Sequence, residues 1–334
     1  MTTEDLAVRA PARTAPMKWR THGRSGGAAA LAMAVALLAS GCAAAGLSFL
    51  DPQGPVAVAQ RAHLLKMTAI TLVVVLPVLV LVPLLAWRYR YKNKRAPYTP
   101  DWEYSGPLEL AMWGVPVIIV VLLATQLWRN TIALDPYAPV APGRPVLVQV
   151  VGLDWKWLFI YPELGIATIG ELGVPAGTPL ALRLTSDTVM QSFIVSALGS
   201  QIYAMPGMTT QLNLLARQPG EYLGRNTQYN GTGFQDQKFV VRSFAATEFE
   251  AWVGAVRAHG LALDESRYAR LAIPSTPLQT AQALGTANMP PGVVHFNTVA
   301  PGLFDSIVHK YMSGQPVTPP DQAKAPAVQP GGKP

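Results

Sequence analysis

The chain has 334 residues, of which 50% are hydrophobic and 13% are charged. This composition is too apolar for an ordinary soluble protein, and the length suggests about two domains. The formal net charge of +7 does not indicate nucleic-acid binding. The basic residues are grouped beside apolar runs, where they act as topology signals, and no recognition motif accompanies them.

The N-terminus has the pattern of a secretory signal. Basic residues precede the apolar run AAALAMAVALLA at 28–39, which leads through LLASGC to Cys42. This run has the length of a signal-peptide core and is short for a bilayer span, which needs about 20 residues. The ending resembles the lipobox of bacterial lipoproteins, with Ala39 where that motif usually has Leu. We therefore expect a signal peptide over 1–41, a lipid on Cys42 and a periplasmic segment over 42–66. A plain signal anchor is the alternative.

Two longer apolar runs predict a transmembrane hairpin over 67–129, with spans at about 67–87 and 108–128. The sequence RYRYKNKR follows the first span directly, so the positive-inside rule places the connecting loop in the cytoplasm. Both ends of the hairpin are then outside. Glu109 lies at the cytoplasmic start of the second span. A carboxylate at this depth is costly, so Glu109 is either a solvated interfacial side chain or part of a proton pathway.

From Arg144 onward the chain consists of short β-rich runs separated by Pro, Gly, Asn and Asp. This spacing predicts an all-β sandwich or barrel over 144–258. In the run ALRLTS, Leu182 and Leu184 are expected on one face of a strand and Arg183 on the other.

The end of this region predicts an amphipathic helix in ATEFEAWVGAVRAHG. We expect Thr247 and Glu250 to form its capping box. Four residues at helical spacing are expected to form a packing face: Phe249, Trp252, Val253 and Val256. Two weaker patterns predict a small helical extension over 259–313. Its His295 and His309 have no ligand-like spacing. The Pro- and Gly-rich tail over 314–334 is expected to be disordered.

The loop RNTQYNGTGF at 225–234 lies between two predicted strands, a position where several metalloproteins hold their ligands. It contains no Cys, His, Met or carboxylate. The chain's one cysteine is Cys42, and no histidine lies between residues 144 and 257. An intrachain disulfide is therefore excluded, and so is a site built from Cys and His within the β-domain.

The order of these segments resembles subunit II of the haem–copper terminal oxidases over about residues 42–313. The resemblance is carried by DWKWLFIYPELGIATIGEL, VMQSFIVSALGSQIYAMPGM and GEYLGRNTQYNGTGFQDQKF. It implies a membrane-anchored α+β chain. A two-helix transmembrane hairpin would be followed by an all-β cupredoxin-like sandwich and the small helical C-terminal extension.

Copper-binding members of this family hold a dinuclear copper centre with soft and imidazole ligands, which suit copper. The resemblance places Gln191 at the first His position, and Asn226 and Asn230 at the two Cys positions. The remaining positions carry Gln228 for the Glu, Phe234 for the second His and Gln237 for the Met. These residues are therefore expected to bind no metal. We expect Phe234 to fill core space, and Asn226, Gln228 and Asn230 to hold the loop backbone.

Loss of the ligands implies the copper-less branch, the bo-type ubiquinol oxidases. The chain would be a non-catalytic subunit of a proton-pumping complex that oxidises ubiquinol and reduces oxygen to water. It would carry no cofactor, the haems and copper lying in subunit I. The other partners would be subunits III and IV and lipid of a bacterial inner membrane. Glu109 would lie near the mouth of the proton channel. A cytochrome c oxidase subunit and a periplasmic scaffolding lipoprotein are the alternatives.

Overall fold

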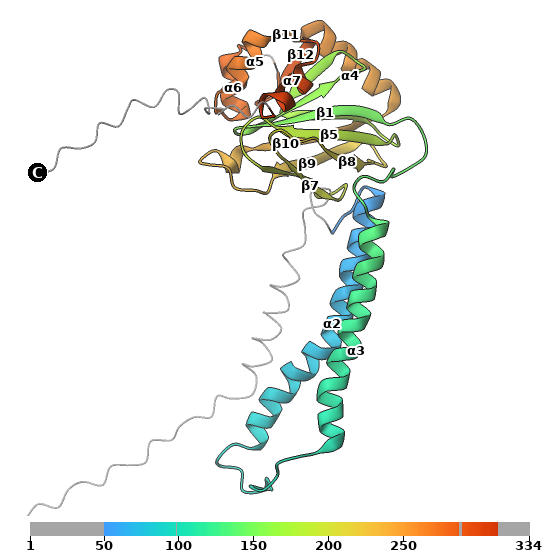
Figure 1. The fold of residues 1–334 in the computed structure, drawn as a ribbon, viewed down its shortest axis with the longest axis vertical. Coiled ribbons are helices and arrows are strands. Elements are labelled where there is room, and N and C mark those ends of the chain that lie inside the picture. Colours follow the sequence, from blue (N-terminus) through green and yellow to red (C-terminus); the bar gives the residue numbers. More distant parts are fainter. Residues whose placement is uncertain (1–49, 98, 287–288, 313–334) are drawn as a thin grey trace, which may run out of the picture. The chain divides into compact units, whose positions relative to one another are not determined.

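The computed structural model describes residues 50–97, 99–286 and 289–312. The expected signal peptide over 1–41, the lipidation site Cys42 and the tail over 314–334 lie outside the described residues. The described chain contains a helical hairpin, a β-domain and a C-terminal extension (Figure 1).

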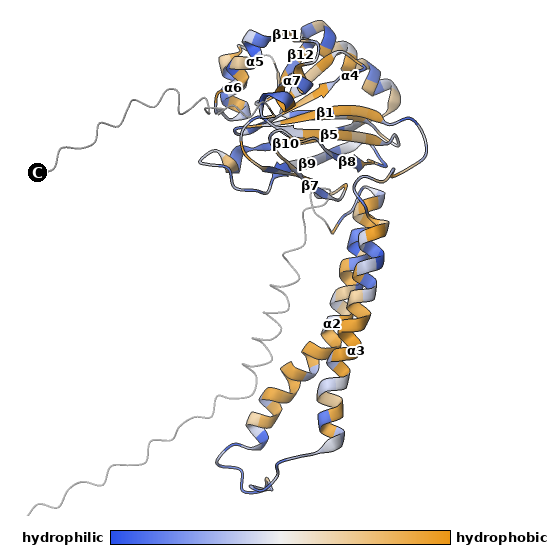
Figure 2. Cartoon of the chain, viewed as in Figure 1, coloured by the Kyte–Doolittle hydropathy of each residue, from blue (hydrophilic) through white to orange (hydrophobic). Residues whose placement is uncertain are grey.

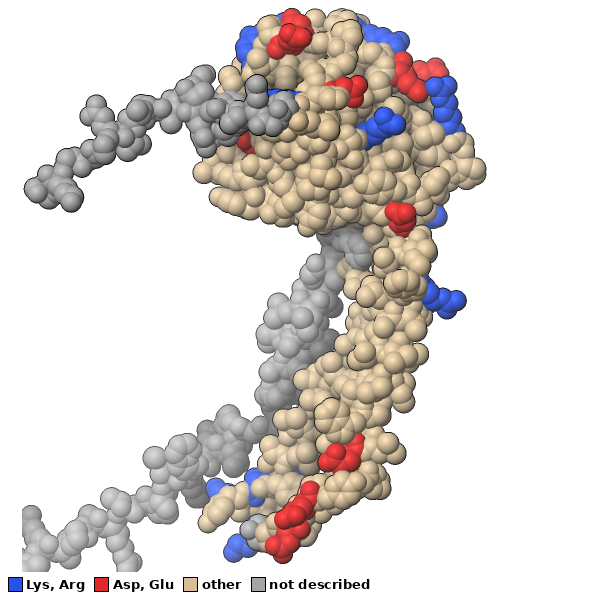
Figure 3. Space-filling model, viewed as in Figure 1, with Lys and Arg blue, Asp and Glu red and all other residues tan. Residues whose placement is uncertain are grey.

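The hairpin consists of α2 (Pro55–Arg88) and α3 (Gly106–Ala133). Both helices are long and apolar enough to cross a membrane, and Figure 2 shows the apolar residues along them. Charged side chains gather near the loop that joins them (Figure 3). The half of α2 nearer this loop leans away from α3 (Figure 1) and contains Pro77 and Pro83. A proline removes one helical hydrogen bond and clashes with the preceding turn, which explains the bend.

The β-domain and the extension share two sheets. The first sheet has the order β11-β12-β3-β2-β1-β5-β8 and the second β4-β10-β9-β6-β7. The strands of the first sheet, in chain order, are β1 (Val146–Leu153), β2 (Lys156–Tyr161), β3 (Ile166–Ile169), β5 (Leu180–Ser186), β8 (Thr210–Leu214), β11 (Leu261–Leu263) and β12 (Val294–Val299). Those of the second are β4 (Glu171–Pro175), β6 (Gln191–Val195), β7 (Gln201–Ala204), β9 (Gly220–Asn226) and β10 (Lys238–Phe244).

The main core lies between the two sheets and is aromatic at its centre. Trp157 on β2 meets Phe193 on β6 edge to face at 5.2 Å, and Phe193 stacks on Phe239 of β10 at 5.0 Å. In β5, Leu182 and Leu184 are fully buried and Arg183 is exposed, so the predicted alternation is confirmed. The predicted cupredoxin-like sandwich is confirmed as well.

Helix α4 (Ala246–His259) follows β10 and buries three residues of the predicted face, Trp252, Val253 and Val256. The fourth, Phe249, is partly buried and packs against the same core. The predicted capping box was wrong, because the helix begins earlier than Thr247. Glu248, rather than Glu250, accepts a hydrogen bond from the N–H of Ala245 at 3.2 Å. The N-cap is therefore Ala245, two residues closer to β10 than the predicted Thr247.

The extension is more than the small helical segment predicted from the sequence. It contains α5 (Glu265–Leu271), α6 (Pro277–Ala283) and α7 (Leu303–Lys310). It also adds β11 and β12 to the first sheet, where β12 pairs antiparallel with β3. A second hydrophobic cluster forms on that sheet and includes Leu158, Ile160, Phe296, Phe304 and Ile307. Strand β2 is therefore buried on both faces.

Candidate functional site

Four of the six positions that the resemblance assigned to the former metal site come together in space. They meet where the ends of β6, β9 and β10 lie side by side in the second sheet. Gln191 begins β6, Asn226 ends β9, and Gln237 lies between the short 3-10 helix η2 (Phe234–Asp236) and β10. Strand β9 pairs with both β6 and β10, so these strand ends meet. Asn230 reaches the same place from the loop between β9 and η2.

The carboxamide of Gln237 is the centre of this cluster. Its Nε2 donates to Gln191 Oε1 at 2.5 Å and to the carbonyl oxygen of Leu153 at 3.1 Å. Its Oε1 accepts from Asn226 Nδ2 at 3.0 Å and from Asn230 Nδ2 at 2.8 Å. Gln237 is fully buried, and both ends of its amide are satisfied, as a buried polar group requires. We call these four residues the amide cluster.

Close packing by glycine makes room for the cluster. A Cβ atom on Gly152 would lie 2.6 Å from Gln191 Oε1, a distance that no ordinary contact reaches. Gln191 uses the space to donate from Nε2 to Leu153 O at 3.3 Å and to Thr188 Oγ1 at 3.1 Å. A larger residue at position 152 would push this amide away from Gln237.

Asn226 also holds the loop, as predicted. Its Oδ1 accepts from the N–H groups of Ser192 and Gln228, both at 2.9 Å, and its Nδ2 donates to Gln228 O at 2.8 Å. Gln228 takes part in two of these three bonds, through its backbone and not through the side chain on which the prediction relied. Asn230 donates to the cluster, and its carbonyl oxygen accepts from Trp155 Nε1 at 3.1 Å. Side-chain amides that bond nearby backbone groups stabilise such turns.

Phe234 does not fill core space, so this prediction was wrong. It is half-buried and belongs to neither hydrophobic cluster. Its ring lies 5.7 Å from that of Tyr229, which is 71% exposed. Phe193, Phe239 and Trp157 already pack together in the neighbouring core, which leaves Phe234 near the surface of the loop.

The residues at these six positions do not fit a dinuclear copper centre. Copper of this kind needs thiolate and imidazole donors, and the six side chains supply amides and one phenyl ring. Within the described ranges, no three His, Cys, Asp or Glu side chains gather as they would around a metal ion. The amides form hydrogen bonds, and none of them is a redox group, a nucleophile or a strong base.

A buried lysine adjoins the amide cluster and was not singled out from the sequence. The Nζ of Lys156 donates to four oxygens at 2.9–3.0 Å, namely Asp154 O, Ile273 O, Ser275 O and Ser275 Oγ. Burial lowers the pKa of Lys156 to about 7, and the charge of Asp154 acts in the opposite direction. The side chain therefore ties the start of β2 to the extension. The sequence signal that could have pointed to a buried Lys156 is its position between two tryptophans in DWKW.

A second charged group that the sequence did not reveal is Glu171 on β4. Its Oε1 accepts from Trp252 Nε1 at 3.0 Å and from Nε2 of His295, and Arg242 Nε lies 3.6 Å from its Oε2. Burial alone would raise the pKa of Glu171. The hydrogen bonds from His295 and Trp252 and the charges of His295 and Arg242 outweigh burial and lower that pKa. His295 thus has a structural partner that its sequence position did not suggest.

In the hairpin, Glu109 lies in the first turn of α3. It is half-buried, and its backbone N–H donates to Ser105 O at 2.9 Å. It lies at the end of α3 nearest the connecting loop, well apart along the chain from the amide cluster. The position is the one expected for a group at the membrane boundary, and its role in a proton pathway stays a prediction.

Comparison with known families identifies two segments of the chain. Residues 166–244 match the family described as cytochrome C oxidase subunit II, periplasmic domain. Residues 291–315 match the family described as COX Aromatic Rich Motif. The first segment contains all six positions discussed above, and the second contains β12 and α7.

Curated relatives match most of the chain. Ubiquinol oxidase subunit 2 of Acetobacter aceti is 44% identical over 283 residues, covering 84% of this chain and 86% of that protein. Cytochrome bo(3) ubiquinol oxidase subunit 2 of Pseudomonas putida is 42% identical over 276 residues, covering 82% and 83%. Quinol oxidase subunit 2 of Bacillus cereus is 34% identical over 249 residues, covering 74% and 85%.

Proposed function

The chain belongs to the ubiquinol oxidase subunit 2 family, and from this premise we propose how it serves the complex. It is subunit II of a quinol-oxidising member of the haem–copper oxidases, and therefore part of an oxidoreductase. The complex oxidises ubiquinol and reduces oxygen to water in the aerobic respiratory chain. This chain is its non-catalytic subunit.

The amide cluster is the observation that carries this assignment. By the resemblance to the copper-binding family, it occupies the positions where those proteins hold their metal, and its side chains hydrogen-bond to one another. A domain of this kind has no acceptor for an electron from cytochrome c. Electrons would therefore pass from ubiquinol directly to subunit I, and the haems and copper would lie there.

The remaining roles concern assembly and location. The two helices would pack on subunit I within a bacterial inner membrane, and the β-domain would cover the periplasmic face of that subunit. Tethering by two spans keeps the domain at a high effective concentration beside its partner. Subunits III and IV would complete a proton-pumping complex.

The segment boundaries follow the same scheme. We propose a signal peptide over 1–41, a lipid on Cys42 and a periplasmic segment over 42–66. The hairpin at 67–129 would then be followed by the cupredoxin-like domain at 144–258, the extension at 259–313 and a disordered tail at 314–334. The lipid would hold the N-terminus at the same membrane surface as the β-domain.

Purification of the complex from membranes tests the function. We expect haem to co-purify, oxygen uptake to proceed with ubiquinol and not with reduced cytochrome c, and the isolated chain to contain no copper. A stoichiometric copper pair in this chain, together with oxidation of cytochrome c, would support the cytochrome c oxidase alternative instead. Purification without haem would favour a scaffolding lipoprotein.

Glu109 is proposed to line the mouth of the proton channel, because it lies at the loop end of α3 in a position where a carboxylate is costly without a role. We expect Glu109→Gln to slow quinol-dependent oxygen uptake severalfold while the complex still assembles. Glu103→Gln is the matched control, since Glu103 is an exposed carboxylate in the neighbouring loop. Equal turnover in both variants would remove Glu109 from the pathway.

A further inference from the structure

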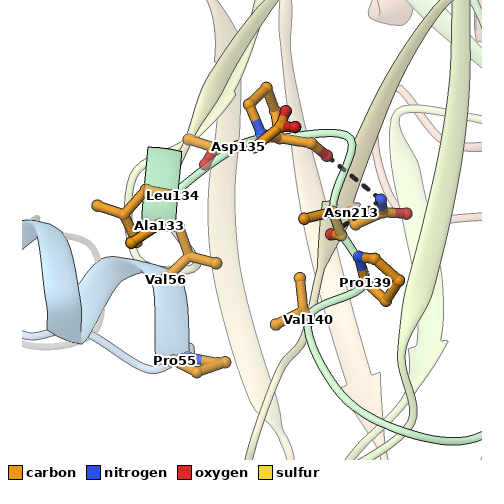
Figure 4. Close-up of a pocket in the computed structure, with 11 residues that line it drawn as sticks. Pro55, Val56, Ala133, Leu134, Asp135, Pro139, Val140 and Asn213 are labelled. Carbon is orange, nitrogen blue, oxygen red and sulfur yellow. Dashed lines mark hydrogen bonds between the residues drawn. The ribbon is translucent and has the colours of Figure 1, made fainter. Parts of the chain in front are cut away.

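A small cavity lies where the hairpin meets the β-domain (Figure 4). It has a volume of about 190 Å³, far more than the roughly 10–15 Å³ that one ordered water needs. Its walls come from the first turn of α2, the last residues of α3 with the loop that follows, and two positions of the β-domain. Apolar residues dominate the lining, and its polar members are Asp135, Ser200 and Asn213.

Hydrogen bonds fix the walls of this cavity before any ligand enters. Nδ2 of Asn213 lies within 3.3 Å of the carbonyl oxygens of Pro136, Tyr137 and Ala138. On the other side, the N–H of Gln53 donates to Ala197 O at 2.7 Å. Preorganised walls reduce the cost of binding.

Gly54, the residue directly before α2, lets the chain come close to the backbone of the β-domain. A Cβ atom on Gly54 would lie 2.7 Å from the carbonyl oxygens of both Leu198 and Leu215. The N–H of Ala57 donates to Leu198 O at 3.2 Å. The first turn of α2 is therefore held against the β-domain by direct contacts between backbone atoms.

The position of the cavity relative to the proposed bilayer indicates a membrane lipid as its occupant. It adjoins the ends of both helices, and the apolar stretches of those helices begin only beyond Arg61 and Lys66 on α2 and Arg129 on α3. At about 1.5 Å per residue, Arg61 and Arg129 lie roughly 6–9 Å along the helices from the cavity. On the proposed membrane orientation, this is the level of the head groups of the outer leaflet.

The charges select one kind of head group. Basic residues lie toward the bilayer, where lipid phosphates are found. Asp135 is the acidic residue of the lining; it is exposed, and its Oδ1 accepts from the N–H of Tyr137 at 2.9 Å. A zwitterionic lipid whose phosphate is deeper than its amine matches this order. The lining contains neither Lys nor Arg, which disfavours an anionic head group. It also contains no aromatic residue, whereas quaternary ammonium groups are recognised by aromatic cages.

We propose that this cavity binds the primary ammonium of a phosphatidylethanolamine-type lipid. The ammonium donates to the carboxylate of Asp135, with Ser200 and Asn213 as further polar neighbours, and Val56, Leu134 and Val140 cover its methylene groups. The inference rests on the proposed membrane orientation and not on quinol oxidation. The lipid holds the junction between the hairpin and the β-domain at the membrane surface.

The full-length chain with its co-purifying subunits, reconstituted in nanodiscs of equal parts phosphatidylethanolamine, phosphatidylcholine and phosphatidylglycerol, provides the test. After detergent extraction, native mass spectrometry counts the lipids retained per complex. We expect at least fivefold less retained phosphatidylethanolamine at one site in Asp135→Asn. Val140→Phe, which fills the cavity from the loop, is expected to give the same loss.

Asp101→Asn is the control, because Asp101 is an exposed carboxylate near the loop between α2 and α3, and it should retain the lipid. Retention of all three lipids alike, or unchanged retention in both cavity variants, would overturn the proposal. Circular dichroism and quinol-dependent oxygen uptake report folding and function separately. If the proposed function is wrong, quinol-dependent oxygen uptake will be absent. The number of retained lipids will still show whether the cavity binds phosphatidylethanolamine.

Discussion

Replacing Gln237 by leucine is expected to lower the free energy of unfolding by about 2–5 kcal/mol. The substitution leaves Gln191 Oε1 and one donor of Asn230 buried without their partner, and each such group costs roughly 1–3 kcal/mol. Asn226 retains a bond to Gln228 O, and Leu153 O retains one from Gln191, so these two atoms add little. Guanidinium denaturation of the full chain in detergent, followed by tryptophan fluorescence, measures the change.

Gln235→Leu is the matched control for this prediction. Gln235 lies in the 3-10 helix η2, two residues before Gln237, and is exposed. Its substitution is expected to change the free energy of unfolding by less than about 0.5 kcal/mol. Equal midpoints for the two variants, at an unchanged denaturant slope, would show that the amide cluster does not stabilise the loop.

The positions of the amide cluster could be predicted from the sequence, but its bonding could not. Matching VMQSFIVSALGSQIYAMPGM and GEYLGRNTQYNGTGFQDQKF to the family's segments located Gln191, Asn226, Asn230 and Gln237 correctly as neighbours. Which amide atom donates to which depends on strand pairings between residues far apart in the chain. The resemblance also suggested that Phe234 would replace a buried ligand, whereas the short helix η2 holds it near the surface.

Periodicity located the helices well and missed the short strands. The stripe of Trp252, Val253 and Val256 identified the buried face of α4, since a helical repeat is a local signal. Strand β11 has three residues, too few to show an alternation. Strand β12 contains the exposed Thr298 and the half-buried His295, so its pattern is weak. Strand β12 forms because β3 offers it a partner, and β11 then pairs with β12.

Polar clusters, rather than the hydrophobic stripe alone, decide where the extension packs. Lys156 bonds the segment between α5 and α6 through Ile273 and Ser275. Asp187 accepts from Tyr268 of α5 at 2.7 Å and from Lys310 of α7 at 2.8 Å. Hydrophobic packing is weakly directional, whereas these bonds specify one arrangement. Apolar periodicity in the sequence cannot reveal these bonds, because the two partners of each bond are more than 80 residues apart.

Glu171→Ala is expected to lower the free energy of unfolding by about 3–5 kcal/mol, the cost of breaking a buried ion pair. Its side chain is 2% exposed, and its removal leaves Trp252 Nε1 and His295 without their acceptor while Arg242 loses a nearby charge. Because Trp252 belongs to α4 and His295 to β12, the extension should loosen with them. Hydrogen exchange should rise in β12 and α4 before it rises in β6. Denaturation and hydrogen exchange of the full chain measure the two effects.

Glu221→Ala is the control, because Glu221 also contacts Arg242, at 3.1 Å, but is 65% exposed. An exposed pair of this kind contributes at most about 1 kcal/mol. A loss in Glu221→Ala as large as that in Glu171→Ala would show that burial of the carboxylate is not the cause. Unchanged exchange in β12 would show that Glu171 does not hold the extension.

The contribution of Glu171 to the free energy of unfolding should also depend on pH in the acid range. The pKa of Glu171 is lower in the folded chain than its ordinary value of 4.5, so the unfolded chain binds more protons between these two values. The stabilisation by Glu171 is therefore complete above pH 4.5 and is lost as the pH falls through the lowered pKa. Glu171→Gln keeps the shape of the side chain and removes the titration. We expect its free energy of unfolding to fall less steeply with acid than that of the unchanged chain, and parallel acid profiles would exclude Glu171 as the group responsible.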